Sequence, residues 1–117
     1  MSLFAPLAVA VEVRAEEGEH GRRIYRLSNS VAESGLMLER PAPFDIGRPV
    51  TVRFTLPDLA TITPLAVRAR VSLTDDDGEG EHGGSHLEFV DPPRESRQSI
   101  MRYVMGRLGL PGGEPVR

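Results

Sequence analysis

Apolar and polar residues alternate along most of the chain, with apolar side chains at every second position. This period of two is the pattern of half-buried β-strands. Stretches rich in glycine and proline separate the alternating segments and predict turns or loops between them. The predicted strands are residues 7–13, 22–31, 36–38, 50–56, 65–73 and 87–89.

The alternation also predicts which side chains face the core. In the second predicted strand we expect Tyr25, Leu27 and Val31 to share one face. The fifth strand has the clearest pattern, with Arg68 and Arg70 on the face opposite its apolar residues. Those apolar residues are Leu65, Val67, Ala69, Val71 and Leu73.

The period changes from two to that of a helix near the end of the chain. Ile100, Val104 and Leu108 lie at helical spacing, with arginines at the polar positions between them. We expect Asp91 to cap the N-terminus of this helix and Gly109 to end it. The chain therefore contains one predicted amphipathic helix after its strands.

The order of these elements predicts the fold class. Six strands followed by one helix predict an all-β fold with one helix, a six-stranded antiparallel β-barrel whose C-terminal amphipathic helix lies against one opening or edge. The length of 117 residues is typical of one domain with its own core. We expect this domain to span residues 1–109 and residues 110–117 to form a flexible tail.

Composition and charge argue against several classes of function. The net charge of −3 disfavours general binding to nucleic acid or anionic lipid. The chain has no cysteine, no apolar run near the ~20 residues that span a membrane, and no signal-peptide pattern at its start. We therefore expect a cytoplasmic protein without membrane insertion. All fourteen basic residues are arginine, which fits either genome composition or selection for bidentate contacts with phosphate or guanine.

Four ordered segments carry a family resemblance. They are Ser30-Val-Ala-Glu-Ser-Gly35, Pro41-Ala-Pro-Phe-Asp-Ile-Gly47, Val50-Thr-Val-Arg-Phe-Thr-Leu-Pro57 and His86-Leu-Glu-Phe-Val90. In this order they resemble the PilZ family of bacterial cyclic di-GMP receptors and their non-binding relatives, over roughly residues 5–108. The resemblance implies a PilZ-like barrel and a regulatory role in motility, pilus or envelope signalling.

The family's loop motif, Asp/Asn-x-Ser-x-x-Gly, is incomplete in this chain. Alignment on Gly35 places Ser30 at the Asp/Asn position and Ala32 at the Ser position. Asp or Asn can hydrogen-bond guanine edges, whereas Ser30 can do so only in part and Ala32 has no hydroxyl. Gly35 is explained by backbone geometry alone. The altered motif favours a tight turn without a ligand.

The family's second motif, Arg-x-x-x-Arg, normally precedes the first strand, where its guanidiniums bind the ligand's phosphates and guanine faces. Residues 1–6 contain no arginine. A literal match lies inside the second predicted strand, where its arginines could line one face or simply be solvated. If cyclic di-GMP is bound, the candidate ligand-binding residues are Arg22, Arg23, Arg26, Ser30 and Gly35.

Catalytic and metal chemistry find little support. There is no thiol, the histidines lie in or beside turns, and Ser34 lacks the Gly-x-Ser-x-Gly context of an acyl-transfer nucleophile. We expect no enzymatic activity and no cofactor. Residues 75–86 begin like a calcium loop, but His86 stands where a bidentate carboxylate is needed. We expect a flexible hairpin loop there rather than a metal site.

The predicted helix offers a candidate surface for a protein partner. Met101 and Met105 flank its apolar stripe, and methionine makes adaptable contacts both in cores and at partner-binding surfaces. They either fill the seam between helix and barrel or form a docking face for another protein or a second copy. Two functions remain open: an adaptor that acts by protein contact without standard cyclic di-GMP binding, and a cyclic di-GMP sensor. A nucleic-acid-binding barrel fits less well, because few aromatic residues are present for base stacking.

Overall fold

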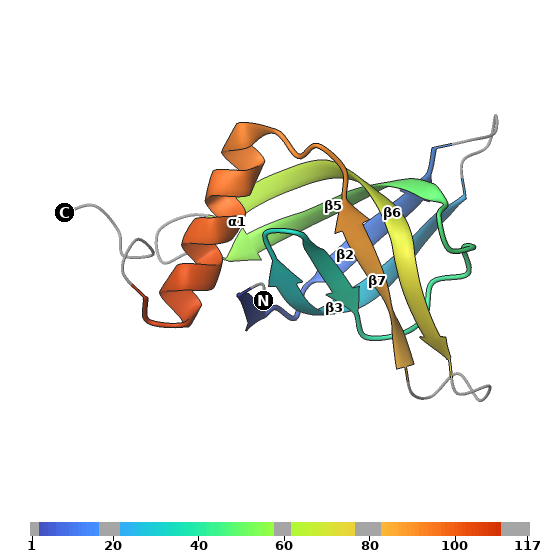
Figure 1. Cartoon of the computed structure of the whole chain (residues 1–117), viewed down its shortest axis with the longest axis horizontal. Coiled ribbons are helices and arrows are strands. Elements are labelled where there is room, and N and C mark those ends of the chain that lie inside the picture. Colours follow the sequence, from blue (N-terminus) through green and yellow to red (C-terminus); the bar gives the residue numbers. More distant parts are fainter. Residues whose placement is uncertain (1–2, 17–21, 58–61, 77–82, 111–117) are drawn as a thin grey trace.

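Strand pairing closes a six-stranded antiparallel barrel, as the alternation predicts (Figure 1). The computed structural model describes residues 3–16, 22–57, 62–76 and 83–110. The ring runs β3-β2-β5-β6-β7-β4 and returns to β3, while the short β1 pairs with β3 beside β2. The elements are β1 (Phe4–Pro6), β2 (Ala10–Ala15), β3 (Arg23–Ala32), β4 (Gly35–Leu38), β5 (Pro49–Pro57), β6 (Ile62–Asp76), β7 (Gly83–Phe89) and α1 (Arg94–Arg107).

The first predicted strand, residues 7–13, is a strand only from Ala10, where β2 begins. A break at residues 7–9 separates β2 from the earlier β1, and both lie on the same edge of β3. A buried serine of β3 bridges the break. The Ser28 hydroxyl donates to the carbonyl of Leu7 and accepts from the amide of Val9 at 3.0 Å. The backbone groups of Leu7 and Val9 therefore keep hydrogen-bond partners across the break.

The prediction of which β3 side chains face the core is wrong. Tyr25 and Leu27 are 60% and 53% exposed, whereas Ile24, Ser28 and Val31 are buried. The register of β3 against β4 shifts between Ser28 and Ser30. This irregularity changes which positions face inward, because a shift of one residue sends a side chain to the other face of the sheet.

β6 confirms most of the predicted pattern. Leu65, Val67, Ala69 and Val71 are buried, and Arg68 and Arg70 lie on the exposed face. Leu73 is 52% exposed, contrary to expectation, because the register against β7 shifts between Val71 and Leu73. β6 and β7 also extend into the predicted acidic loop, pairing as far as Asp76 and Gly83. Residues 77–82 of that loop lie outside the described residues.

Helix α1 begins later than expected. Pro93 occupies the N-cap position without a side-chain cap, and Asp91 has a φ of 44°. The predicted Asp91 cap is wrong because Pro92, which would be the first helical residue after it, itself precedes a proline and is disfavoured in the helical conformation. Gly109, with a φ of 70°, ends the helix as predicted.

The helix packs its apolar stripe against one end of the barrel (Figure 1). Ile100 and Val104 are fully buried, whereas Leu108 lies past the last turn and is 42% exposed. The Tyr103 hydroxyl donates to the carbonyl of Pro6 at 2.8 Å, which ties α1 to β1. Burial raises the pKa of this phenol.

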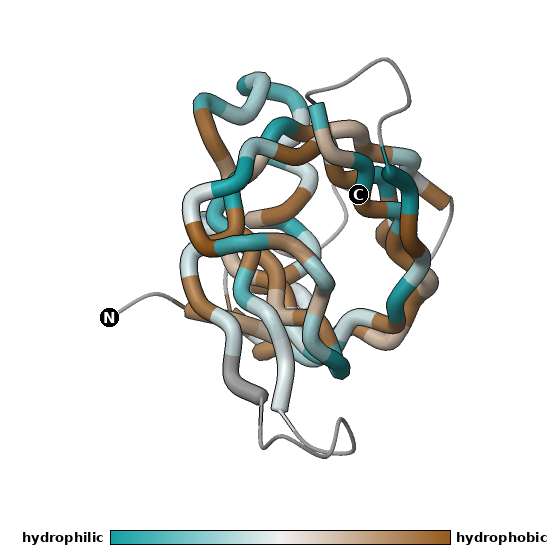
Figure 2. The backbone as a smooth tube through the Cα atoms, turned by 90° about the vertical axis from the view of Figure 1, so that its right-hand side faces the viewer, coloured by the Kyte–Doolittle hydropathy of each residue, from teal (hydrophilic) through white to brown (hydrophobic). Residues whose placement is uncertain are grey.

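One continuous hydrophobic core fills the barrel and the space under α1. Figure 2 shows the strands arranged in a ring, with hydrophilic and hydrophobic residues alternating along them. Phe54 and Phe89 stack inside with their ring centres 6.2 Å apart. Of the predicted tail, residues 111–117 lie outside the described residues. Among the described residues, no helix has the length and apolar character needed to cross a bilayer.

Candidate functional site

The loop motif forms the hairpin between β3 and β4. Its turn consists of Glu33 and Ser34, with Ala32 and Gly35 paired across it. Ser30 is half-buried and lies between Met37 of β4 on one side and Pro6 of β1 on the other. The hairpin is therefore packed between neighbouring strands at the α1 end of the barrel.

Gly35 is required by close packing of two strands. A Cβ built on Gly35 would collide with the carbonyl oxygen of Leu87 and would lie 3.0 Å from His86 Nε2. Gly35 does not have a positive φ, unlike Gly47 and Gly109. The backbone explanation of this glycine therefore rests on the approach of β7 to β4 rather than on the turn.

The predicted arginines lie further along β3. Arg22 is exposed just before the strand, and Arg23 forms an ion pair with Glu12 at 3.6 Å. Arg26 donates from Nε to the carbonyl of Pro41 at 3.3 Å and from Nη1 to its neighbour's carbonyl at 3.0 Å.

The strand separates these arginines from the loop motif. At ~3.3 Å per residue, Arg26 and Arg23 lie about 13 Å and 23 Å along the strand from Ser30. The described structure thus does not bring the predicted arginines together around Gly35, and their role in ligand binding stays a prediction.

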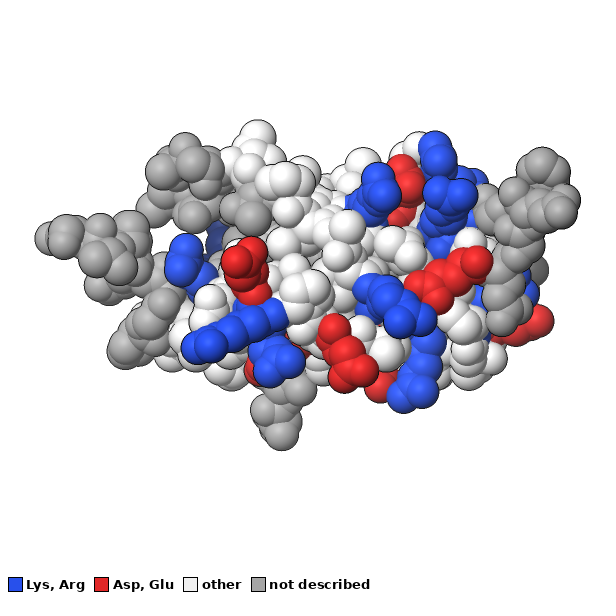
Figure 3. Space-filling model, turned by 90° about the horizontal axis from the view of Figure 1, so that it is seen from above, with Lys and Arg blue, Asp and Glu red and all other residues white. Residues whose placement is uncertain are grey.

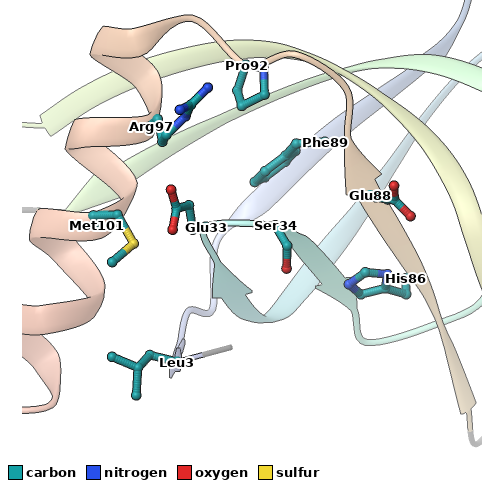
Figure 4. A pocket seen from close by; sticks show the side chains of 9 residues that line it. All are labelled: Leu3, Glu33, Ser34, His86, Glu88, Phe89, Pro92, Arg97 and Met101. Carbon is teal, nitrogen blue, oxygen red and sulfur yellow. The ribbon is translucent and has the colours of Figure 1, made fainter. Parts of the chain in front are cut away.

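A groove of about 660 Å³ lies between the β3–β4 turn, β7 and α1. Figure 4 shows Glu33 extending from the turn toward the helix, which presents Met101 and Arg97. The groove is lined by Leu3, Glu33, Ser34, His86, Glu88, Phe89, Pro92, Arg97 and Met101. Its mixture of apolar and charged groups suits a protein side chain as well as a polar ligand.

The imidazole of His86 lies against Gly35 at one end of this groove. Its Nδ1 lies 2.5 Å from the hydroxyl of Ser72, which also lies 3.2 Å from the backbone carbonyl of His86. When the Ser72 proton is donated to that carbonyl, Nδ1 carries the ring proton and Nε2 is left as an acceptor near the groove. Ser72 therefore fixes the orientation of the ring.

Charge in the groove comes from three side chains. Glu88 is paired with Arg70 at 2.9 Å on the outer face of the sheet. Glu33 and Arg97 are exposed on opposite walls. Arg97 is the arginine that lies beside the loop motif, and the sequence prediction assigned it only a polar helix position. The four-residue spacing of Arg97 and Met101 places both side chains on one face of the helix. The spacing alone does not show that this face meets the β3–β4 turn.

The two candidate partner-binding methionines are both half-buried. Met101 lines the groove, and Met105 follows one turn later on the same face of α1. The placement of Met101 is compatible with both predicted roles, since it packs at the helix–barrel seam and also borders an open groove.

Metal ligands do not cluster in the part of the chain that the structure describes. There, no group of three or more His, Cys, Asp or Glu residues is close enough to hold an ion. The central residues of the acidic loop, 77–82, lie outside this part.

Comparisons with known proteins identify the barrel. A family model described as PilZ domain matches residues 5–106. A comparison with curated protein sequences gave no match. MotI/DgrA, the inhibitor of motility of Bacillus subtilis, has a TM-score of 0.77 at 18% identity, over 92% of this chain and 50% of that chain.

Two further structures share the fold. The PilZ domain of CeSA from a cellulose-synthesizing bacterium gives a TM-score of 0.62 at 19% identity, covering 88% of this chain and 95% of that chain. The PilZ domain of YcgR from Escherichia coli with cyclic di-GMP gives 0.59 at 8% identity, covering 91% and 90%. The chain thus spans half of MotI, and at these identities the likeness shows the fold alone.

Proposed function

The chain belongs to the PilZ domain family, and from this premise we propose that it is a regulatory adaptor that acts by contact with a protein partner. PilZ domains are receptor and adaptor domains rather than enzymes. We place the partner in motility, pilus or envelope signalling. The name of MotI as an inhibitor of motility supports a signalling role of this kind.

One observation carries the preference for protein contact over ligand binding. Of the two arginines that match Arg-x-x-x-Arg, Arg22 is exposed just before β3 and Arg26 hydrogen-bonds the carbonyl of Pro41, away from the altered loop motif. Gly35, the intact position of that motif, is accounted for by packing against β7. Neither motif therefore supplies an assembled set of guanidinium and carboxamide groups for a dinucleotide.

The alternative is a cyclic di-GMP sensor that uses Arg22, Arg23 or Arg26 with the loop from Ser30 to Gly35. The presence of cyclic di-GMP in the YcgR domain keeps this alternative testable. It would require β3 arginines to release their present contacts, including the hydrogen bond from Arg26 to Pro41.

Titration calorimetry of the chain with cyclic di-GMP is expected to give a flat trace at roughly tens of micromolar protein. The YcgR PilZ domain serves as a positive control in the same buffer. Saturable heat that weakens in Arg26→Ala would instead show that the chain is a cyclic di-GMP sensor. Arg53→Ala, on an exposed face of β5, is the control and should leave that heat unchanged.

A charge placed on the outer face of α1 is expected to abolish partner binding. Met105→Glu puts a carboxylate beside Met101 without touching the buried stripe of the helix. A pull-down from the native cell should recover a partner with the unaltered chain and lose it with this variant. Leu73→Glu, which charges an exposed apolar residue of β6, is the matched control and should retain the partner. Retention by Met105→Glu would exclude α1 as the docking site.

A further inference from the structure

Helix α1 concentrates positive charge in an acidic protein. Its fourteen residues include four arginines and one glutamate, a net charge of +3. The whole chain has a net charge of −3, so the residues outside α1 together carry −6. Figure 3 shows basic side chains at the end of the molecule where α1 lies, and others at the opposite end with acidic side chains among them. A partner that contacts this helix therefore meets a local excess of positive charge.

Arg107 in the last turn suits the helix dipole, but the arginines near the start of α1 do not stabilise the helix. Arg94 and Arg97 lie in or next to the first turn, where the helix dipole already favours negative charge. The single acid of the helix, Glu95, is neither three nor four residues from any of its arginines, so it forms no favourable helical pair with them. No side chain caps the N-terminus. Side chains that oppose the stability of their own helix are expected where the helix surface has a functional role, such as binding a partner.

Three arginines of the sheet form ion pairs, whereas Arg14, Arg26 and Arg53 form none within the described residues. Arg23, Arg68 and Arg70 each pair with a glutamate of a neighbouring strand or loop. Two hydrogen bonds from Arg68 to Glu16, at 3.0 and 3.2 Å, lower the pKa of that carboxyl. Within the described residues, the arginines of α1 form no ion pair. They are thus available for a partner's acidic groups.

Three of these arginines surround the two methionines. At 3.6 residues per turn, the five residues Arg94, Arg97, Met101, Arg102 and Met105 fall within an arc of about 140° that borders the buried stripe next to Val104. We call these five residues the arginine–methionine face. The guanidiniums of this face can each bind a carboxylate through two parallel hydrogen bonds, and the methionines offer adaptable apolar contact between them.

We propose that the arginine–methionine face binds an acidic, amphipathic segment of a protein partner. The proposal rests on the proposed function and adds the chemistry of the partner. The net charge of −3 on the whole chain disfavours a long polyanion or an anionic membrane, whose contact would extend beyond α1. Leu108 is the only strongly exposed large apolar residue of α1 and its C-cap. One such side chain offers too little apolar surface for insertion into a lipid bilayer. A short acidic segment can contact this face without extending beyond α1.

A synthetic peptide of about 20 residues tests this recognition directly, because that length allows a helix. It carries glutamate at every fourth position with leucine beside each glutamate, on an alanine and glutamine background. A second peptide has glutamine in place of glutamate. Fluorescence anisotropy with the whole chain should show binding of the glutamate peptide only, weakening as salt rises. The variant Arg94→Gln/Arg97→Gln/Arg102→Gln should bind roughly tenfold or more weakly.

The control variant Arg14→Gln/Arg53→Gln/Arg68→Gln makes the same change in charge on the sheet and should bind as the unaltered chain does. Equal binding by the α1 variant, or no binding of the glutamate peptide, overturns the proposal. Tighter binding of phosphatidylglycerol vesicles or single-stranded RNA than of the peptide also overturns it. A cell partner that is lost with Met105→Glu but kept with the α1 arginine variant would leave the adaptor function intact and refute only the acidic recognition.

Discussion

Replacing Gly35 with alanine is expected to lower the free energy of unfolding by about 2–3 kcal/mol. The added Cβ would collide with the carbonyl oxygen of Leu87 and press on the imidazole of His86. Gly35 and Leu87 lie on the paired strands β4 and β7, so the collision is relieved only by moving backbone. Urea unfolding followed by circular dichroism measures the loss as a lower midpoint at constant slope.

Gly106 supplies a matched control for this substitution. It lies exposed in α1, where alanine is a better helix former than glycine. Gly106→Ala should therefore stabilise the protein by up to about 1 kcal/mol, the opposite sign from Gly35→Ala. Unchanged stability in Gly35→Ala would mean that β4 and β7 separate without cost, and a ligand-based reason for this glycine would then be needed.

The alternation of apolar residues predicted the barrel because most strands keep one register along their length. β5 pairs with β6 over nine consecutive positions, from Pro49 with Arg70 to Pro57 with Ile62. In these strands the predicted core face is the buried face. Register in such a pair is set by the hydrophobic pattern itself, which the sequence contains.

The same reasoning failed where a strand has irregular pairing. The shift between Ser28 and Ser30 exposes Leu27, and the shift between Val71 and Leu73 exposes Leu73. Each irregularity depends on the partner strand, and nothing in the local sequence specifies it. The Ser28 hydroxyl hydrogen-bonds the backbone at the break between β1 and β2. Because serine is polar, the alternation pattern predicts it on the surface rather than in the core.

The candidate site was predicted in part. The sequence identified the hairpin motif around Gly35 and the methionines of the helix, but it gave Arg97 only a polar helix position. It could not bring the helix to the β3–β4 turn, since that contact joins segments more than sixty residues apart in the chain. The groove exists only through this tertiary contact.

Ile100→Ala is expected to lower the free energy of unfolding by about 2–4 kcal/mol, the range for deleting buried methyl and methylene groups from a core. Ile100 is fully buried between α1 and the barrel, within the same hydrophobic cluster as the strands. Thermal unfolding should still show one transition, because helix and barrel share that core. Gln98→Ala, on the exposed side of the same helix, is the control and should change stability little.

The number of transitions decides how α1 presents its arginines. A single transition means that the hydrogen bond from Tyr103 to Pro6 and the burial of Ile100 hold the helix as part of the barrel. The arginine–methionine face is then rigid, and a partner loses little free energy in ordering it. A helical signal that melts separately in Ile100→Ala, before the strands, would contradict this unity. In that case the partner would also have to order the helix against the barrel. Ile100→Ala would then weaken binding of the acidic peptide, although Ile100 does not contact the peptide.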